Sequence, residues 1–213
     1  MIYILKNPEV VCSLLLQHLQ ITLVALLIAV LVALPTAGLI RHYRWLKIPV
    51  ISTLSILYTV PSLALIILLV PILGLNARSV IAAIAIYSQV ILVRNITAGL
   101  QAIDPAVLEA AQGMGMNAWQ RWWWVQIPLI LPIFLAGLRL AAIVGIAIAT
   151  IGAKFGAGGL GVLLFDGIAQ AGRYDKIWAG AIAVSILAFA INAGLLALEK
   201  MTNPLKQTPL KPI

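Results

Sequence analysis

The chain has 213 residues, of which 63% are hydrophobic and only 9% are charged. Its mean hydropathy of +1.10 excludes an ordinary water-soluble domain, in which about 25% of the residues are charged. The formal net charge of +8 comes from basic residues scattered between apolar segments. Such scattered charges are typical of loops that orient a membrane protein in the bilayer, and they do not form the clustered basic patch of a nucleic-acid-binding protein.

Apolar segments long enough to cross a bilayer recur along the chain. A spanning helix needs about 20 apolar residues, so 213 residues hold roughly five spans and their connections. The sequence therefore predicts a single all-α, polytopic membrane domain that covers residues 1–213. Its spans are expected at about 19–40, 48–73, 79–100, 129–151 and 177–198.

The second span contains Pro61 in its middle. Proline removes a backbone donor and disturbs the preceding turn, so this helix is predicted to kink or unwind locally. Broken helices at membrane depth often mark substrate routes. The candidate pathway-lining residues are the polar side chains around this proline and within the third span: Tyr58, Thr59, Ser62, Ser88 and Gln89. For each of the five, the alternative is a hydrogen bond between helices.

Two arginines lie inside expected spans. A charge at the bilayer centre costs roughly 2.5–3.5 kcal/mol, and less near an interface. Arg94, near one end of the third span, is interpreted as a snorkelling residue, the alternative being that it faces the bundle and tethers the following loop. Arg139 in the fourth span is interpreted in the same way, with pairing to an acidic group as the alternative.

Residues 104–128 form the only long polar interruption. Asp104 can cap a helix, and Pro105 suits the first helical position, so a short helix is predicted to begin here. Gly115 lies where this helix would end. A second short helix, 117–125, is predicted to end before Pro128. On these grounds alone the segment reads as a solvated helix–turn–helix connection.

The same segment resembles the EAA loop of bacterial ABC-importer permeases, which has the form E-A-A, three residues, G, nine residues and I-x-L-P. The matching residues are Glu109, Ala110, Ala111, Gly115 and Pro128. Val125 and Ile127 stand where the pattern has Ile and Leu, and both keep an apolar side chain. In that family the loop is the coupling helix, which docks into a groove on the ATP-binding subunit. The resemblance implies this role for the matching residues, with Glu109 as the anionic contact and Gly115 as the turn.

The wider sequence is similar to the osmoprotectant branch of that family, whose substrates include glycine betaine, choline and carnitine, over nearly the whole chain. The resemblance implies a type I ABC-importer permease that forms the pathway and is not itself an enzyme. Implied partners are a dimer of ATP-binding subunits, a second permease copy or close relative, an external substrate-binding protein and membrane lipids. No G-x-x-x-x-G-K-[ST] motif occurs, so ATP and Mg are expected in the partner subunit and no cofactor in this chain.

Basic residues predict the orientation of the chain. With five spans, residues 41–47, residues 104–128 and the tail from residue 199 lie on the same side of the membrane. These segments contain seven lysines and arginines, whereas the segments on the other side contain five. The positive-inside rule puts the richer side in the cytoplasm. We therefore expect a bacterial inner-membrane protein with its N-terminus outside and its C-terminus in the cytoplasm.

The second half of the chain contains four further patterns. The tryptophans at 119 and 122–124 are interpreted as an interfacial belt or as contacts to the ATP-binding subunit. The fourth span is rich in Gly and Ala, which predicts burial among its neighbours. Residues 156–161 match G-x-G-x-x-G, but they follow a membrane span and not a strand, so they indicate close backbone packing and not a dinucleotide site. Four charged residues lie on the predicted outer side: Asp166, Arg173, Asp175 and Lys176. They are interpreted either as part of a solvated loop or as part of a contact surface for the binding protein.

Two alternatives of function stay open. One is an importer of methionine or another amino acid, whose permeases share five spans and the same loop. The other is a passive channel or scaffold subunit without an ATPase. A shared metal or catalytic dyad is disfavoured, because His18 and His42 lie at opposite ends of the first span, more than about 30 Å apart along a helix. A membrane protease is disfavoured because no His lies at membrane depth beside a Ser.

Overall fold

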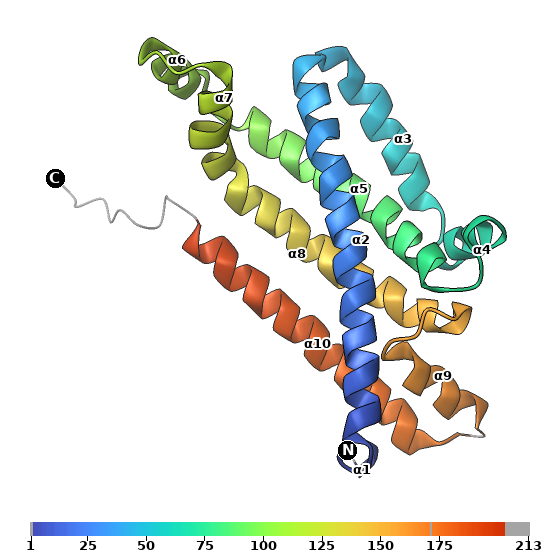
Figure 1. Ribbon diagram of the computed structural model, residues 1–213. Helices are drawn as coiled ribbons and strands as arrows, with labels where there is room; N and C mark the ends of the chain where they lie inside the picture. Colours follow the sequence, from blue (N-terminus) through green and yellow to red (C-terminus); the bar gives the residue numbers. More distant parts are fainter. Residues whose placement is uncertain (1, 171, 203–213) are drawn as a thin grey trace.

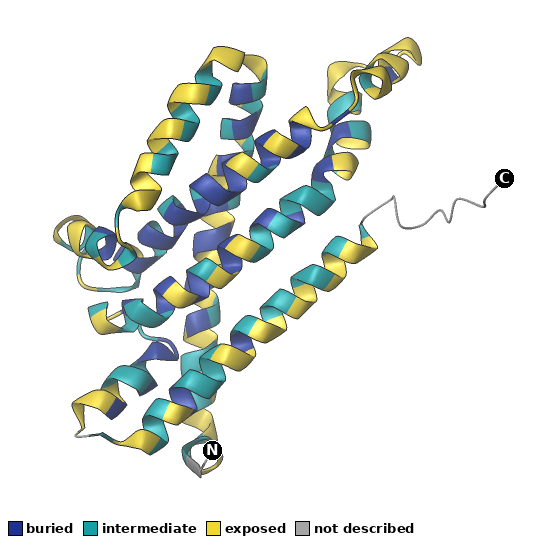
Figure 2. Ribbon diagram, turned by 180° about the vertical axis from the view of Figure 1, so that it is seen from behind, coloured by how far each residue is buried: buried dark blue, intermediate teal, exposed yellow. Residues whose placement is uncertain are grey.

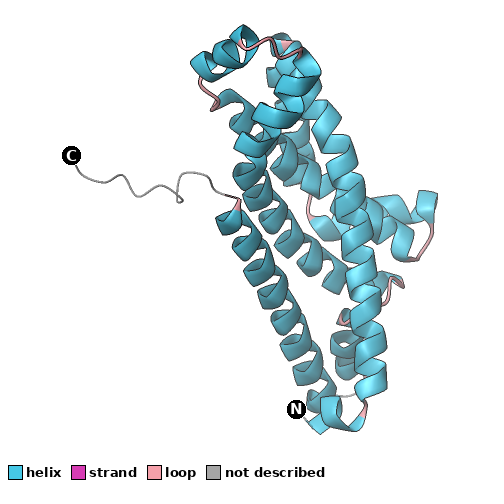
Figure 3. Ribbon diagram, turned by 60° about the vertical axis from the view of Figure 1, so that its left-hand side comes forward, coloured by secondary structure: helices cyan, strands magenta, loops and turns pink. Residues whose placement is uncertain are grey.

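The computed structural model describes residues 2–170 and 172–202, and within these ranges it is built from helices joined by short connections (Figures 1 and 3). In order, the elements are α1 (Ile2–Lys6), α2 (Pro8–His42), η1 (Arg44–Leu46), α3 (Lys47–Thr59), α4 (Ser62–Leu73), α5 (Ala77–Gln101), α6 (Pro105–Gly113), α7 (Ala118–Gln120), η2 (Arg121–Gln126), α8 (Ile127–Gly152), η3 (Ala153–Phe155), α9 (Gly161–Ala169) and α10 (Tyr174–Met201). The predicted all-α polytopic fold is confirmed.

Helix α5 lies at the centre of the bundle, between α2 and α8. In its most apolar window 67% of the residues are buried, against 39% for the helix that contains α8 and 6% for α10. Figure 2 shows the buried residues gathered on α5 and on the faces of its neighbours. Thus the third expected span, and not the small-residue-rich fourth, is the most enclosed.

Small residues allow the helices to approach α5 closely. On α2 a row of alanines at helical spacing is fully buried: Ala25, Ala29, Ala33 and Ala37. On α8, a Cβ added at Gly152 would lie 2.5 Å from the Val80 side chain of α5. Because these contacts leave no room for larger side chains, and at Gly152 none even for a Cβ, the helix backbones approach one another closely. Only one face of α8 takes part, since Ala147 is exposed.

The second expected span is two helices and not one. Helices α3 and α4 are bent by 96° at the break around Val60 and Pro61. Val60 is extended, with φ −65° and ψ 125°, as the residue before a proline prefers. Helix α3 has 13 residues, about 20 Å, which is shorter than the hydrocarbon core of about 30 Å. The predicted kink or local unwinding is therefore a complete change of direction.

The two arginines of the spans both contact neighbouring helices. Arg139 of α8 pairs with Glu199 of α10, with 3.2 Å between nitrogen and oxygen, so the acidic partner considered for it exists. Arg94 of α5 donates a hydrogen bond to the Ser55 hydroxyl of α3 at 2.6 Å. It therefore joins α5 to α3, and its contact is not with the loop that follows α5.

Candidate functional site

Helix α6 has well-formed ends. The Asp104 carboxylate accepts the backbone N–H of Ala106 at 2.9 Å, and proline occupies the first turn. At the other end Gly115 has φ +83°, its N–H donates to the Gln112 carbonyl, and the Met116 N–H donates to the Ala111 carbonyl. This pair of bonds around a left-handed residue is the Schellman motif, in which glycine is favoured. The local sequence thus determines both ends of α6.

The motif residues of α6 mostly face away from the protein. Glu109, Ala110 and Gly115 are exposed, and so is Pro128, whereas Ala111 is only 2% exposed. Helix α6 lies at one end of the bundle, with most of its surface uncovered (Figures 1 and 2). One side of α6 is therefore anchored and the opposite side, including Glu109, is available to another molecule.

The predicted end of the second short helix before Pro128 is wrong. Helix α7 begins at the Asn117 cap, whose side chain and that of Gln120 exchange backbone hydrogen bonds at 2.9 Å. The chain then continues through the π-helical turn η2 into α8, so that residues 118–155 form one helix of 38 residues. Proline clashes with the carbonyl four residues before it. The wider π turn, in which the Ile127 N–H donates to the Trp122 carbonyl, precedes Pro128, and the helix is continuous.

The tryptophans of this segment differ in exposure. Trp119, Trp123 and Trp124 are 70%, 48% and 74% exposed, and the rings of the first two are 5.4 Å apart. Trp122 instead packs against the core. Either interpretation of the cluster, an interfacial belt or a partner contact, therefore concerns three rings and not four.

The break between α3 and α4 gathers three of the five candidate pathway residues. Tyr58, Thr59 and Ser62 flank it, and the Thr59 hydroxyl donates to the Ile56 carbonyl at 2.7 Å. A residue that sequence reasoning missed completes the group. Tyr87 of α5 donates a hydrogen bond from its hydroxyl to the Val60 carbonyl, and its ring lies 5.3 Å from that of Tyr58. The sequence contained one signal for such a residue: backbone carbonyls left without donors at the Pro61 break need a hydrogen-bond donor from a neighbouring helix.

The other two candidates lie one and two residues further along α5. The Gln89 side chain donates to the Ala29 carbonyl of α2 at 3.0 Å, which is the helix–helix hydrogen bond named as its alternative. Ser88 is 1% exposed, and its hydroxyl has no hydrogen-bond partner in the described part of the chain. The side chain that α5 directs to the break is thus Tyr87.

Tyr87→Phe is expected to lower the free energy of unfolding by about 1 kcal/mol, because the part-buried hydrogen bond to the Val60 carbonyl is lost. The ring contact with Tyr58 is retained, so the loss isolates the hydrogen bond. Unfolding of the detergent-solubilised protein by SDS would measure it. The matched control is Tyr58→Phe, whose hydroxyl makes no hydrogen bond to described residues and whose removal should change stability by less than about 0.5 kcal/mol. Equal effects of the two variants would contradict the assignment.

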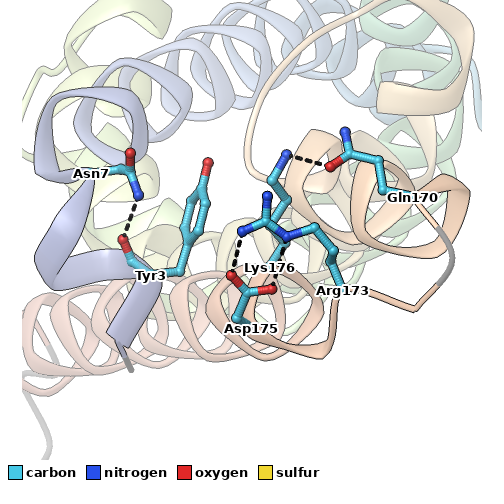
Figure 4. Close-up of polar contacts among 6 residues, drawn as sticks. All are labelled: Tyr3, Asn7, Gln170, Arg173, Asp175 and Lys176. Atoms are coloured by element: carbon cyan, nitrogen blue, oxygen red, sulfur yellow. Dashed lines mark hydrogen bonds and ion pairs between the residues drawn. The ribbon is translucent and has the colours of Figure 1, made fainter.

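The end of the bundle opposite α6 holds the polar residues interpreted as a solvated loop or as a contact surface for a binding protein. Figure 4 shows the Arg173 guanidinium on both oxygens of Asp175, at 3.3 and 2.8 Å, and Lys176 on Gln170 at 3.1 Å. Lys176 also lies over the ring of Tyr3, so α1 and α10 meet here. The hydrogen bond and charge of Asp175 raise the pKa of Arg173. Asp166 is exposed on α9 and takes no part in these contacts.

The glycine-rich segment before α9 packs against α2. The Gly159 N–H donates to the Gln17 side chain at 3.2 Å, and a Cβ on Gly159 would lie 3.0 Å from the His18 ring. Gly156, Gly158 and Gly159 have positive φ, which L side chains rarely adopt. Close backbone packing is therefore the structural role of this segment.

Comparison with known proteins gives one consistent picture. The family described as binding-protein-dependent transport system inner membrane component matches residues 22–205. The chain is 35% identical to an osmoprotectant import permease protein, OsmW, of Salmonella typhimurium, over 95% of this chain and 96% of the relative. It is 39% identical to a carnitine transport permease protein, OpuCB, of Listeria monocytogenes, over 88% and 86% of the two chains. Among solved structures, an inward-facing MetNI methionine ABC transporter matches with a TM-score of 0.82 at 18% identity, covering 93% of this chain and 98% of that one.

Proposed function

The chain belongs to the family of binding-protein-dependent transport system inner membrane components and is the permease component of an ABC importer, and we propose that its solutes are osmoprotectant quaternary amines such as glycine betaine or choline. The observation that supports this solute class is the similarity to an osmoprotectant permease at 35% identity over nearly the full length of both chains. The methionine transporter shares the fold at 18% identity, which carries no information on the solute.

In the proposed mechanism, the exposed side of α6 docks into a groove on a separate ATP-binding subunit, which holds ATP and Mg and performs the hydrolysis. Glu109 is the anionic contact, Ala110 and Ala111 form the docking and anchored faces, and Gly115 makes the turn. Closure of the ATP-binding dimer moves α6. The helix of residues 118–155 passes Pro128 without interruption and carries that displacement to the centre of the bundle, where α8 packs against α5. The bundle thereby exchanges inward-facing and outward-facing states.

The pathway in this proposal lies between two permeases, identical or closely related. The break at Pro61, with Tyr58, Thr59 and Ser62, lines it. Ser88 and Gln89 of α5 stay predictions as lining residues, because Ser88 is buried and Gln89 is bonded to α2. Selection of a quaternary amine requires an aromatic cage, which we assign to an external binding protein. That protein docks at the end opposite α6, on the surface that includes Arg173 and Lys176. The N-terminus is then outside and α6 is in the cytoplasm.

Uptake into proteoliposomes tests this function. The permease, its ATP-binding subunit and its binding protein are reconstituted together, and radiolabelled glycine betaine, choline and methionine are offered outside with ATP inside. Accumulation of a quaternary amine that needs both ATP and the binding protein is expected. Methionine uptake alone would establish the amino-acid alternative. Flux without nucleotide would establish a channel and overturn the proposal.

A further inference from the structure

A polar pocket of about 460 Å³ lies between the last turn of α2, η1 and the last turn of α5. Three basic residues line it: Arg41, Arg44 and Lys47. The polar lining is completed by Thr97 and Gln101 of α5, and we call these five residues the basic pocket. No carboxylate lines it, and in residues 2–170 and 172–202 none of its three cations forms a salt bridge. The pocket therefore concentrates positive charge without an internal counterion.

Two residues that line the basic pocket each carry a buried donor atom without a partner among the described residues. One is the Nη1 atom of Arg41. The other is the hydroxyl of Thr97, a residue that is only 4% exposed. Buried polar groups are nearly always hydrogen-bonded, and an orphaned one is costly. Together with the exposed Arg44, these groups offer donors from two sides of one cavity, which is what the oxygens of a tetrahedral anion require.

Lys47 is positioned by the fold. Its ammonium donates to the Gln101 side chain at 2.9 Å, and this bond joins the start of α3 to the last residue of α5. A phosphate group in the basic pocket would receive hydrogen bonds from arginine guanidinium groups, whose fork geometry matches phosphate. It would also relieve the repulsion among three cations that share one cavity.

The surroundings of the basic pocket favour a lipid as the source of the phosphate. Tyr43 and Trp45 next to it are 46% and 74% exposed, and such residues settle at the headgroup level of a bilayer. An apolar groove of about 340 Å³ begins at the same corner and runs along the start of α3. It is lined by Trp45, Leu46, Pro49, Val50, Thr53 and Leu54. A basic cavity beside an apolar groove at an interface is the arrangement that binds anionic headgroups.

We propose that the basic pocket binds the phosphate group of an anionic lipid headgroup, with one acyl chain along the groove on α3. A zwitterionic headgroup brings its own cation to a cavity that already holds three, so it binds more weakly than an anionic one. The bound phosphate joins α2 and η1 to the end of α5. Since α5 leads within three residues to the Asp104 cap of α6, the lipid also steadies the base of that helix.

Native mass spectrometry of the full chain in detergent tests this site, with phosphatidylglycerol, phosphatidylcholine and inorganic phosphate as separate probes. Phosphatidylglycerol is expected to bind about tenfold or more tightly than phosphatidylcholine. The double variant Arg44→Ala/Lys47→Ala should weaken phosphatidylglycerol about tenfold or more, and Thr97→Val, which keeps the shape of the side chain, should weaken it about threefold. The matched control is Arg78→Ala, an exposed arginine at the other end of α5 that lines no part of the basic pocket.

Circular dichroism and gel-filtration elution identify variants that retain the fold. Competition of inorganic phosphate with phosphatidylglycerol would support the phosphate site and show that a soluble anion also reaches it. Equal binding of the two lipids, or unchanged affinity in the folded double variant, would overturn the proposal. A second pair of results would also overturn the proposal: the native chain binds neither lipid nor phosphate, and the variant Arg44→Glu/Lys47→Glu loses its ATP-binding subunit. The basic pocket would then receive a carboxylate of the partner protein.

Discussion

Glu109→Arg is expected to lower ATP-dependent uptake about tenfold or more and to prevent co-purification of the ATP-binding subunit. Glu109 is exposed on α6 and makes no salt bridge within the described residues, so its reversal leaves the fold of the permease unchanged. In the complex, placing like charges against each other costs several kcal/mol, and each 1.4 kcal/mol is about tenfold in affinity. Proteoliposome uptake and an affinity pull-down measure the two effects.

The control for this variant is Glu9→Arg, which reverses another exposed glutamate in the first turn of α2, at the opposite end of the bundle. It should leave co-purification of the ATP-binding subunit unchanged. If Glu109→Arg assembled and transported normally, α6 would not be the coupling element. The assignment of the motif residues, which is a proposal drawn from their spacing and exposure, would then fail.

Gly161→Ala is expected to lower the free energy of unfolding by about 3 kcal/mol, at the upper end of what overpacking usually costs. A Cβ at this position would lie 2.1 Å from the Thr150 carbonyl oxygen and 2.8 Å from the Ala153 Cβ. The oxygen belongs to the backbone of α8, so a side-chain rotation cannot relieve the clash. Helix α9 must therefore move away from α8. Unfolding by SDS of the purified protein measures the loss.

Gly194→Ala is the matched control, since a Cβ there meets nothing within 4 Å. Gly194 lies inside α10, where alanine favours the helix by roughly 0.5–1 kcal/mol, so this variant should be as stable as the native chain or slightly more stable. A Gly161→Ala protein that matched this control would show that α9 packs differently from the arrangement in Figure 1.

Several features could be predicted because short stretches of sequence determine them. The Asp104 cap and the glycine at 115 are local signals, and the structure places the ends of α6 at them. The break at Pro61 also follows from one residue and its lost donor. The same argument was wrong at Pro128. It predicted that a helix ends before this proline, but a π turn precedes Pro128 and the helix continues past it.

The pathway residues stay predictions. Polar side chains in an apolar helix can face a pathway or a neighbouring helix, and the sequence does not say which. In the structure Gln89 donates a hydrogen bond to a backbone carbonyl of α2. Tyr87 donates to the Val60 carbonyl at the break, 27 positions away in the chain, and no local sequence pattern predicts that contact.

The sequence by itself determined a helical membrane protein with a capped motif helix, because apolar length, capping residues and motif spacing act within a few turns of the chain. The expectation of a permease came from the resemblance that the motif residues carry. Only the tertiary structure decided the 96° turn between α3 and α4, the central place of α5 and the assembly of the basic pocket. The basic pocket, for example, depends on Arg41 and Thr97, which lie far apart in sequence and come together only when the helices pack.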